Sequence, residues 1–399
     1  MEPESTIMKN VIVKKVETQE ENRMVADQMF YAFAASPGSQ ENQLKRREYY
    51  KSAREFIVLD DDKPASTANY VPMTQNIRGK IYEMGGVAGV ATYPEARRKG
   101  YVKLLMRKLF ESMREEKRAI SILYPFRESF YAKFGYITSL QEYDGNFSPS
   151  NLRELPEIKN NLRMERVEFN KGLDDYYNLH LESQKLFHGF SMYEKLWMKA
   201  AELNPPWLIL LRDGDRVVGG MSYKITGFSG TMKIGGLLYL TPRAKYSLFH
   251  WIARHADHVT KVELPLNPMF KLETWIDDLK ITKVTREWVP SHMFRVISID
   301  GLSGMQIGDG KINLKITDSH CDWNNGNWEF RSKNKKLEVR RTSDEPDAEL
   351  TIDGLSAIIY GVYELDDFEI KNWGRLNEAT KQIVRSLFPQ KLPYVSKFV

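Results

Sequence analysis

Residues 90–102 have the sequence Val90-Ala91-Thr92-Tyr93-Pro94-Glu95-Ala96-Arg97-Arg98-Lys99-Gly100-Tyr101-Val102, an apolar strand, a short basic turn with one glycine, and the start of a helix. A helix leaves about four N–H groups unpaired at its first turn and has its positive dipole end there, which together favour a bound phosphate. The three-glycine spacing of a dinucleotide fingerprint and the Gly-Lys-Ser/Thr of a Walker loop are both missing. The string predicts a phosphate-holding loop, and it leaves open a solvated basic turn before an ordinary helix.

Helices and strands alternate around this loop. The long strand at 80–93 contains Gly85, Gly86 and Gly89, and glycines inside a strand are typical of a bulge or a close backbone approach. The helix at 100–117 gathers its apolar side chains on one face. The other expected elements are strands at 9–16, 54–59 and 118–124 and helices at 20–33 and 129–134.

A second block repeats this order, with strands expected at 207–211, 217–225, 231–240 and 261–265 and a helix at 244–258. The correspondence of Gly85-Gly86-Val87 with Gly235-Gly236-Leu237 indicates an internal duplication. The segment before the second block's helix, Pro242-Arg243-Ala244-Lys245-Tyr246, is two residues shorter than the first and lacks its glycine.

After residue 290 short strands dominate, expected at 293–299, 310–316, 327–331, 336–340 and 348–352, followed by helices at 354–363 and 375–388 and a tail at 390–399. We therefore expect three domains, at 8–150, 151–290 and 291–399.

Composition excludes several classes of protein. Of the 399 residues 42% are hydrophobic and 28% charged, which excludes global disorder. The net charge of +5 is small for a nucleic-acid binder. The single cysteine, Cys321, excludes an internal disulfide and favours a reducing cytoplasm. We expect no leader peptide and no membrane span, because no basic start precedes an apolar region and no apolar run approaches ~18 residues.

Two motifs resemble those of one superfamily. The basic turn is similar to the acyl-CoA pyrophosphate loop of the GCN5-related N-acetyltransferases (GNAT), Arg/Gln-x-x-Gly-x-Gly/Ala; Gly100 matches its first glycine, and Val102 departs from its second small residue. Phe130-Tyr131-Ala132-Lys133-Phe134-Gly135-Tyr136 resembles the family's Tyr-Gly-Arg-Phe-Gly-Tyr segment. With the duplicated block and the tail, the chain resembles the Eis-type (enhanced intracellular survival) acetyltransferases.

The resemblance implies a fold of class α/β and α+β. It comprises two acetyltransferase-type mixed α/β domains, the second degenerate and without an intact cofactor loop, and then an α+β domain like a sterol carrier protein. The C-terminal tail of the third domain would reach the active site, and the chains would assemble as hexamers.

Acetyl-CoA is the co-substrate that the resemblance implies. Backbone groups of Val90 and Thr92 would pair with its pantetheine arm, backbone amides from Arg97 to Val102 would hold the pyrophosphate, and Arg97 and Arg98 would add charge. The implied cofactor-binding residues are Val90, Ala91, Thr92, Arg97, Arg98, Lys99, Gly100, Tyr101 and Val102.

The resemblance implies Tyr131 as the general acid and the terminal carboxylate of Val399 as the base. A phenol of pKa ~10 can protonate a thiolate of pKa ~8.5–10 at little cost. The residues alone favour a packing role for Tyr131, beside Phe130 and Phe134. The implied acceptors are amines of cationic substrates, either aminoglycoside-like polyamines or lysine side chains.

Other sites are disfavoured by the sequence. His255 and His258 have metal-compatible helical spacing but no third ligand nearby, so no metal is expected. Cys321 lies in a predicted turn, and no role as a nucleophile is expected for it. The basic hairpin at 331–336 indicates a solvated edge rather than a nucleic-acid patch. Two alternatives stay open: a binding protein that holds an apolar ligand in the C-terminal domain, and a protein-lysine acetyltransferase.

Overall fold

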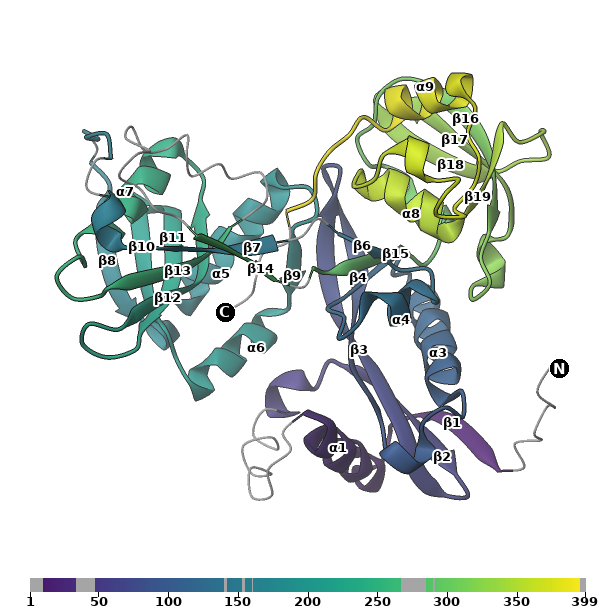
Figure 1. Cartoon of the computed structure of the whole chain (residues 1–399), viewed down its shortest axis with the longest axis horizontal. Coiled ribbons are helices and arrows are strands. Elements are labelled where there is room, and N and C mark those ends of the chain that lie inside the picture. Colours follow the sequence, from purple (N-terminus) through teal and green to yellow (C-terminus); the bar gives the residue numbers. More distant parts are fainter. Residues whose placement is uncertain are drawn as a thin grey trace.

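The computed structural model describes residues 10–33, 47–139, 142–152, 155–159, 161–266, 285–289 and 291–394. They form three β-sheets with attached helices, seen in Figure 1 as three lobes. The first two sheets belong to mixed α/β units and the third to an α+β unit, which confirms the predicted fold class.

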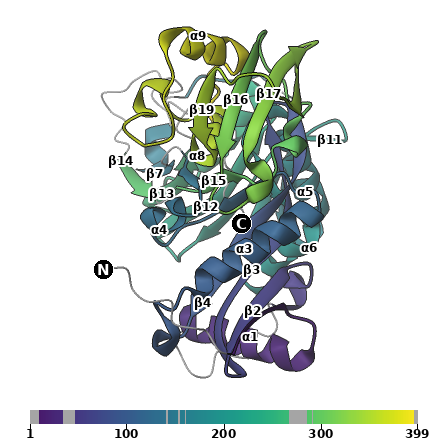
Figure 2. The ribbon, with the colours of Figure 1, turned by 90° about the vertical axis from the view of Figure 1, so that its right-hand side faces the viewer.

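The first sheet has the order β1-β2-β3-β4-β5-β15-β6, with β9 added to β3. Helix α3 packs on it through an apolar stripe, and Figure 2 shows this helix crossing the sheet. The strands are β1 (Val11–Lys15), β2 (Arg54–Asp60), β3 (Lys63–Ile77), β4 (Lys80–Thr92), β5 (Ile120–Leu123), β15 (Met293–Val296), β6 (Ile137–Thr138) and β9 (Ser191–Tyr193). The helices are α1 (Gln19–Phe33), α3 (Tyr101–Glu115) and α4 (Glu128–Ala132).

The second sheet has the order β14-β7-β13-β12-β11-β10-β8. Its strands are β14 (Thr285–Val289), β7 (Glu142–Phe147), β13 (Lys261–Leu266), β12 (Thr231–Tyr239), β11 (Arg216–Ile225), β10 (Trp207–Asp213) and β8 (Arg163–Glu168). Its helices are α5 (Phe169–Leu186), α6 (Lys195–Met198) and α7 (Pro242–Ala253), with a 3-10 helix, η4, at Lys199–Leu203.

The third sheet has the order β18-β17-β16-β19. Its strands are β18 (Lys336–Arg341), β17 (Gly326–Lys333), β16 (Lys311–Thr317) and β19 (Ala348–Thr351), and its helices are α8 (Ile352–Tyr360) and α9 (Glu378–Leu387). All residues of helix α8 except Asp353 are buried, and most of them are apolar, as expected for a helix that is covered on nearly every side.

One strand lies in a different sheet from the one that its sequence position suggests. The strand at 293–299 was expected in the third domain, but β15 pairs with β5 and β6 in the first sheet. Figure 1 shows it as a green strand among blue ones. Conversely β7, which follows β6 directly in sequence, pairs with β13 and β14 in the second sheet. The first two units are thus interlocked by strands that cross between them.

The duplication has a different register from the one expected. Val87 is the last β4 residue paired with β5, and a bulge containing Gly89 follows two residues later. Lys233 is the last β12 residue paired with β13, and a bulge containing Gly235 follows at the same spacing. The structural counterpart of Gly235 is therefore Gly89, not Gly85.

The first and third units share one hydrophobic core. Phe294 of β15 stacks on Tyr360 of α8 with ring centroids 4.1 Å apart and planes 1° from parallel. At the turn between β3 and β4, the guanidinium of buried Arg78 donates to the carbonyl oxygens of Ile358 and Ile359 at the C-terminus of α8. These contacts fix the third unit against the first.

Candidate active site

Strands β4 and β5 separate after a short parallel pairing. They pair from Met84 with Ile120 to Val87 with Leu123, and no described strand pairs with this edge of β4 beyond Val87. Two residues of the β4 bulge, Gly89 and Val90, lie opposite the single residue Ala68 of β3. The backbone of β4 therefore presents a free edge toward its C-terminal end.

The backbone angle favours glycine at the bulge. Gly89 has φ +60°, and the atom nearest to an added Cβ, at 2.3 Å, would be Nδ2 at the end of the Asn69 side chain. The bulge itself is the feature that glycines inside the strand predicted.

A cavity of about 290 Å³ lies where the two strands separate. Its walls are apolar strand residues and aromatic side chains, and no Asp or Glu lines it among the described residues. Phe126 is 72% exposed at the edge of the cavity. The lining includes Phe33, Val71, Met73, Val87, Val90, Leu123, Tyr124, Phe126, Tyr131, Tyr193, Trp197 and His292.

Tyr131, which the sequence resemblance implies as the general acid, lines this cavity from α4. It is 5% exposed, and its ring makes an edge-to-face contact with Phe130 at a centroid distance of 5.1 Å. Burial raises the pKa of its phenol to about 12. The hydroxyl has no hydrogen-bond partner in the described part of the chain, so it is a proton donor available to a ligand.

Side chains of β15 and of the third unit bind the backbone at the C-terminal end of α4. Arg295 of β15 donates to the carbonyl oxygen of Phe134, and its Nη2 donates to both carboxylate oxygens of Asp318, at 2.7 and 2.6 Å. His320 Nε2 lies 2.8 Å from the carbonyl oxygen of Lys133, which can only accept, so the imidazole donates. Two side chains of the third unit therefore help to fix the helix of Tyr131: His320 directly, and Asp318 through Arg295.

The basic loop between β4 and α3 has an open anion-facing geometry. Arg98 has φ +65° and Gly100 φ +83°, and no side chain caps the start of α3. A Cβ at Gly100 would contact nothing within 4 Å, so it is the backbone angle that favours glycine there. Arg97 and Arg98 are exposed, and neither side chain has an ion-pair partner among the described residues.

Lys99 and Tyr101 turn their side chains elsewhere. Lys99 Nζ lies 3.0 Å and the Tyr101 hydroxyl 2.5 Å from Asp60 Oδ2 at the end of β2. Bonds from Tyr101 and then Lys99 hold the pKa of the Asp60 carboxyl below its usual range. Only the backbone of these two residues can serve an anion at the loop.

The other predicted cofactor residues lie along β4. Val90 is in the bulge, while Ala91 is buried and its carbonyl accepts from Ser66 Oγ at 2.9 Å. Thr92 Oγ1 lies 2.7 Å from the same hydroxyl. Val102 is half-buried on α3.

The second unit lacks an equivalent loop. Only two residues separate β12 from α7, where eight separate β4 from α3. Pro242 has no N–H to offer, and Thr241 Oγ1 already accepts from the Ala244 amide at 3.2 Å. The start of α7 is therefore capped by its own chain.

Several residues of the site were missed by sequence reasoning. Tyr193 comes from β9, Trp197 from α6, and His292 from the segment before β15. All three arrive through long-range pairing, such as Met73 with Tyr193, and carry no local motif. Val399 lies outside the described residues.

The tail is described as far as Tyr394. Its amide donates to the carbonyl oxygen of His188 at 2.7 Å, and its ring packs against Phe187 and Phe190. The tail thus leaves the third unit and contacts the segment that leads into β9.

Other features of the described residues fit no separate site. No three His, Cys, Asp or Glu side chains converge in this part of the chain, and none of its helices is both long and apolar enough to cross a membrane. Cys321 is fully buried, and burial raises the pKa of its thiol to about 12.

Comparison with known proteins agrees with this geometry. A model of the acetyltransferase (GNAT) domain matches residues 13–138, and a model of the sterol carrier protein domain matches residues 301–396. An uncharacterized N-acetyltransferase of Streptomyces avermitilis is 20% identical over 94% of this chain and 97% of its own length.

Solved structures share the whole fold. A probable N-acyltransferase of Enterococcus faecalis has a TM-score of 0.87 at 21% identity, covering 98% of this chain and all of its own. Eis1 of Mycobacterium abscessus has a TM-score of 0.81 at 14% identity, covering 96% of this chain and 99% of its own. The chain therefore contains an acetyltransferase (GNAT) domain around the β4–β5 cavity and a sterol carrier protein domain behind it, and it shares the overall fold of Eis1.

Proposed function

We propose that the chain transfers an acetyl group from acetyl-CoA to a primary amine bound in the cavity between β4 and β5. The observation that carries this proposal is the continuity of the free β4 edge with the uncapped basic loop, next to a cavity that holds a free tyrosine hydroxyl. Acetyl-CoA has a thioester, a long arm with two amides, and a pyrophosphate. These three parts match the cavity, the free edge of β4 and the basic loop, in that order.

Binding of acetyl-CoA would use backbone more than side chains. Val90 and Thr92 would pair with the amides of the pantetheine arm, with Ala91 between them. The amides from Arg98 to Val102 would hold the pyrophosphate, because the Arg97 amide donates to the carbonyl oxygen of Pro94; the side chains of Arg97 and Arg98 would add charge. Lys99 and Tyr101 would act through backbone and keep the loop in place through Asp60.

Tyr131 would donate its proton to the sulfur of the leaving thiolate. Because its pKa is raised to about 12, the phenol stays protonated throughout the physiological range. It is a weaker acid than a free phenol, so its contribution is a strong hydrogen bond that becomes proton transfer as charge develops on sulfur.

The base stays a proposal. The terminal carboxylate of Val399 would accept the proton of the amine, in one concerted direct transfer without an acyl-enzyme. The contact of Tyr394 with His188 supports this proposal, because it brings the described tail to the segment that supplies Ser191 and Tyr193 to the cavity wall.

Of the two acceptor classes that the sequence resemblance implies, the cavity favours a lysine-like amine. A polycation requires carboxylates to anchor its several charges, and none lines the cavity among the described residues. An amine on an apolar stem suits walls of aromatic and aliphatic side chains. A hexamer and a cytoplasmic location, both expected from the sequence, stay predictions.

Release of CoA thiol with a panel of primary amines tests the proposal, with Tyr131→Phe as the decisive variant and Tyr239→Phe as its matched control. Both phenols have a pKa raised to about 12 by burial, but Tyr239 lies on β12, away from the cavity. Loss of turnover in the first variant alone supports the proposal. Equal turnover in wild type and Tyr131→Phe contradicts the role of Tyr131.

A further inference from the structure

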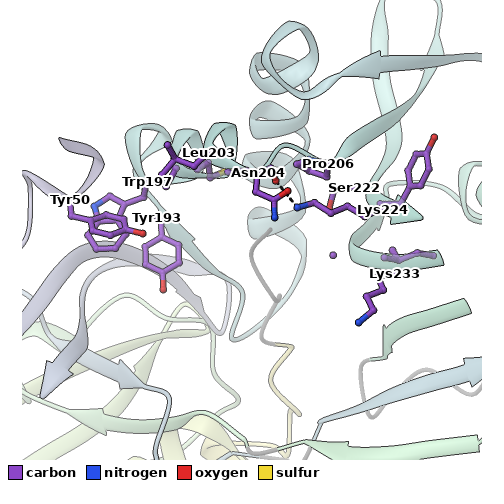
Figure 3. A pocket seen from close by; sticks show the side chains of 15 residues that line it. Tyr50, Tyr193, Trp197, Leu203, Asn204, Pro206, Ser222, Lys224 and Lys233 are labelled. Atoms are coloured by element: carbon purple, nitrogen blue, oxygen red, sulfur yellow. Dashed lines mark hydrogen bonds between the residues drawn. The ribbon is translucent and has the colours of Figure 1, made fainter. Parts of the chain in front are cut away.

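A second and larger cavity, of about 580 Å³, adjoins the reaction cavity. It is formed between the aromatic residues next to the first sheet and the strands β11 and β12 of the second (Figure 3). Tyr193 and Trp197 line both cavities, so the two cavities meet at these aromatic side chains.

The shared residues Tyr193 and Trp197 belong to a stack of three rings, whose third member, Tyr50, lines only the second cavity. Trp197 stacks on Tyr50 with centroids 4.2 Å apart and on Tyr193 with centroids 5.4 Å apart. Trp197 Nε1 donates to Ser52 Oγ at 3.0 Å, which fixes the plane of the indole. A flat, fixed wall of this kind suits the apolar stem of a ligand that passes along it.

Two lysines form the opposite side of the second cavity, as Figure 3 shows. Lys224 of β11 and Lys233 of β12 are direct cross-strand partners. Like charges directly opposite one another destabilise a sheet. A bound anion would remove this cost.

The lysines are only partly neutralised by the protein. Lys224 Nζ donates to a backbone carbonyl, that of Asn204, at 2.6 Å. Lys233 Nζ lies 3.6 Å from a carboxylate oxygen of Glu263, whose other oxygen bonds Lys261 at 2.9 Å. No Asp or Glu lines the cavity among the described residues, so the cavity has an excess of positive charge.

The position of Lys233 indicates how this cavity arose. Val87 is the last residue of β4 that pairs with β5, and Lys233 is the last residue of β12 that pairs with β13. Lys233 is therefore the structural counterpart of Val87, which lines the reaction cavity. The second unit has thus kept a cavity at the duplicated place while its cofactor loop was shortened. A lysine now stands where the first unit has valine.

We propose that the second cavity binds a carboxylate at the far end of the acceptor. This inference rests on the proposed function and names its substrate class: a small ω-amino carboxylate, whose amine lies in the reaction cavity and whose apolar stem runs past Tyr193 and Trp197. Lys224 and Lys233 bind the carboxylate.

Matched acceptors test this assignment. Thiol release from acetyl-CoA is measured with ω-amino acids of increasing chain length, with the corresponding ω-amino amides, and with α,ω-diamines. At the best length, kcat/KM for the carboxylate should exceed that for the amide and the diamine at least roughly tenfold, since one charge-assisted hydrogen bond is worth that much. Equal values for the three acceptors overturn the proposal.

Substitution of each lysine tests whether Lys224 and Lys233 bind the carboxylate of the acceptor. Lys224→Met and Lys233→Met should each lower kcat/KM for the carboxylate severalfold while the value for the amide stays unchanged. Lys315→Met is the matched control, because that lysine lies on the third sheet in a pair with Glu349. The assignment is overturned if kcat/KM for the carboxylate falls equally in Lys315→Met, or if kcat/KM for the amide falls equally in Lys224→Met and Lys233→Met.

Direct binding separates this inference from the proposed function. If no amine is acetylated, calorimetric titration of the ω-amino carboxylates still reports on the second cavity. Binding that weakens in Lys224→Met supports the carboxylate site even though acetyl transfer fails. Titrations that are the same in wild type and variant contradict it.

Discussion

The guanidinium of Arg295 and the carboxylate of Asp318 lie 2.6 Å apart, and neither side chain is exposed. Arg295 belongs to the first sheet and Asp318 to the segment after β16, so the pair joins the acetyltransferase unit to the sterol carrier unit. The same guanidinium holds the carbonyl of Phe134 at the end of α4. The orientation of the helix of Tyr131 thus depends on a charge supplied by the third unit.

Asp318→Asn should weaken both stability and turnover. It leaves the buried guanidinium without its counter-charge, which costs about 3–5 kcal/mol of unfolding free energy. Through α4 it should lower kcat, while KM for acetyl-CoA stays unchanged because the loop is untouched. Urea unfolding and steady-state kinetics measure the two effects.

Two further variants control that experiment. Glu338→Gln removes an exposed ion pair with Arg331 and should change neither quantity measurably. Asp318→Glu keeps the charge and should recover part of kcat. A kcat of Asp318→Asn equal to that of wild type would show that α4 is held without this pair.

Tyr131→Phe should lower kcat by roughly 10²–10⁴, the usual contribution of a general acid. Affinity for acetyl-CoA should not change. Since burial raises the pKa of this phenol to about 12, the proton is lost only above that pH. The pH profile of kcat should therefore show no fall near pH 10 that is due to Tyr131; a fall at that pH that disappears in Tyr131→Phe would be inconsistent with the buried phenol.

The double variant Arg97→Ala/Arg98→Ala should raise KM for acetyl-CoA roughly tenfold or more, because charge-assisted hydrogen bonds contribute about 1.5–3 kcal/mol each. The value of kcat should stay near that of wild type, since neither residue lies at the reacting atoms. Lys108→Ala is the matched control, because that lysine lies further along α3, away from the loop, and is paired with Glu111. A KM that rises equally in the control would place the pyrophosphate elsewhere.

Extension of the chain beyond Val399 should abolish turnover and leave acetyl-CoA binding intact, because it removes the carboxylate proposed as base. The matched comparison is the same extension at the N-terminus. Full activity of the C-terminally extended chain would place the base on another residue, with His292 in the cavity wall the first to substitute.

Glu329 should contribute to the acid stability of the third sheet. Hydrogen bonds from Arg340 and Lys311 lower its pKa to about 2. A carboxyl whose pKa is depressed on folding stabilises the protein above its unfolded value, and this contribution is lost as the pH falls from about 4.5 toward 2. Glu329→Gln should flatten the loss of thermal stability in that window; an unchanged pH dependence of the melting temperature would contradict this.

Local chemistry was predictable from the sequence, and long-range assembly was not. The loop at Arg97 to Gly100 and the helix of Tyr131 were identified because each motif is contiguous and its backbone demands are local. Acetyltransferase class and the sterol carrier domain followed from the resemblance and are confirmed. The domain limits, the cofactor contacts and the Val399 base remain predictions.

The features that could not be predicted from the sequence all depend on how distant strands pair. Nothing in Met293–Val296 shows that it joins β5 rather than the third sheet, since an apolar strand can pair with any open edge. Tyr193 and Trp197 reach the cavity only because β9 adds to β3. The duplication was detected, but its register depends on the positions of the bulges. The glycine pattern alone pairs Gly235 with Gly85, four residues before its structural counterpart Gly89.

The crossing of β15 into the first sheet also sets the order of events during synthesis. About 170 residues separate β5 from β15, so a ribosome that adds roughly 5–20 residues per second needs about 10–30 s between them. Until then the apolar edge of β5 has no partner on that side, and an open strand edge is a site for mispairing. The catalytic unit, although it is encoded first, can be completed only when most of the polypeptide has been made, and a nascent chain stalled before residue 293 should need a chaperone to remain foldable.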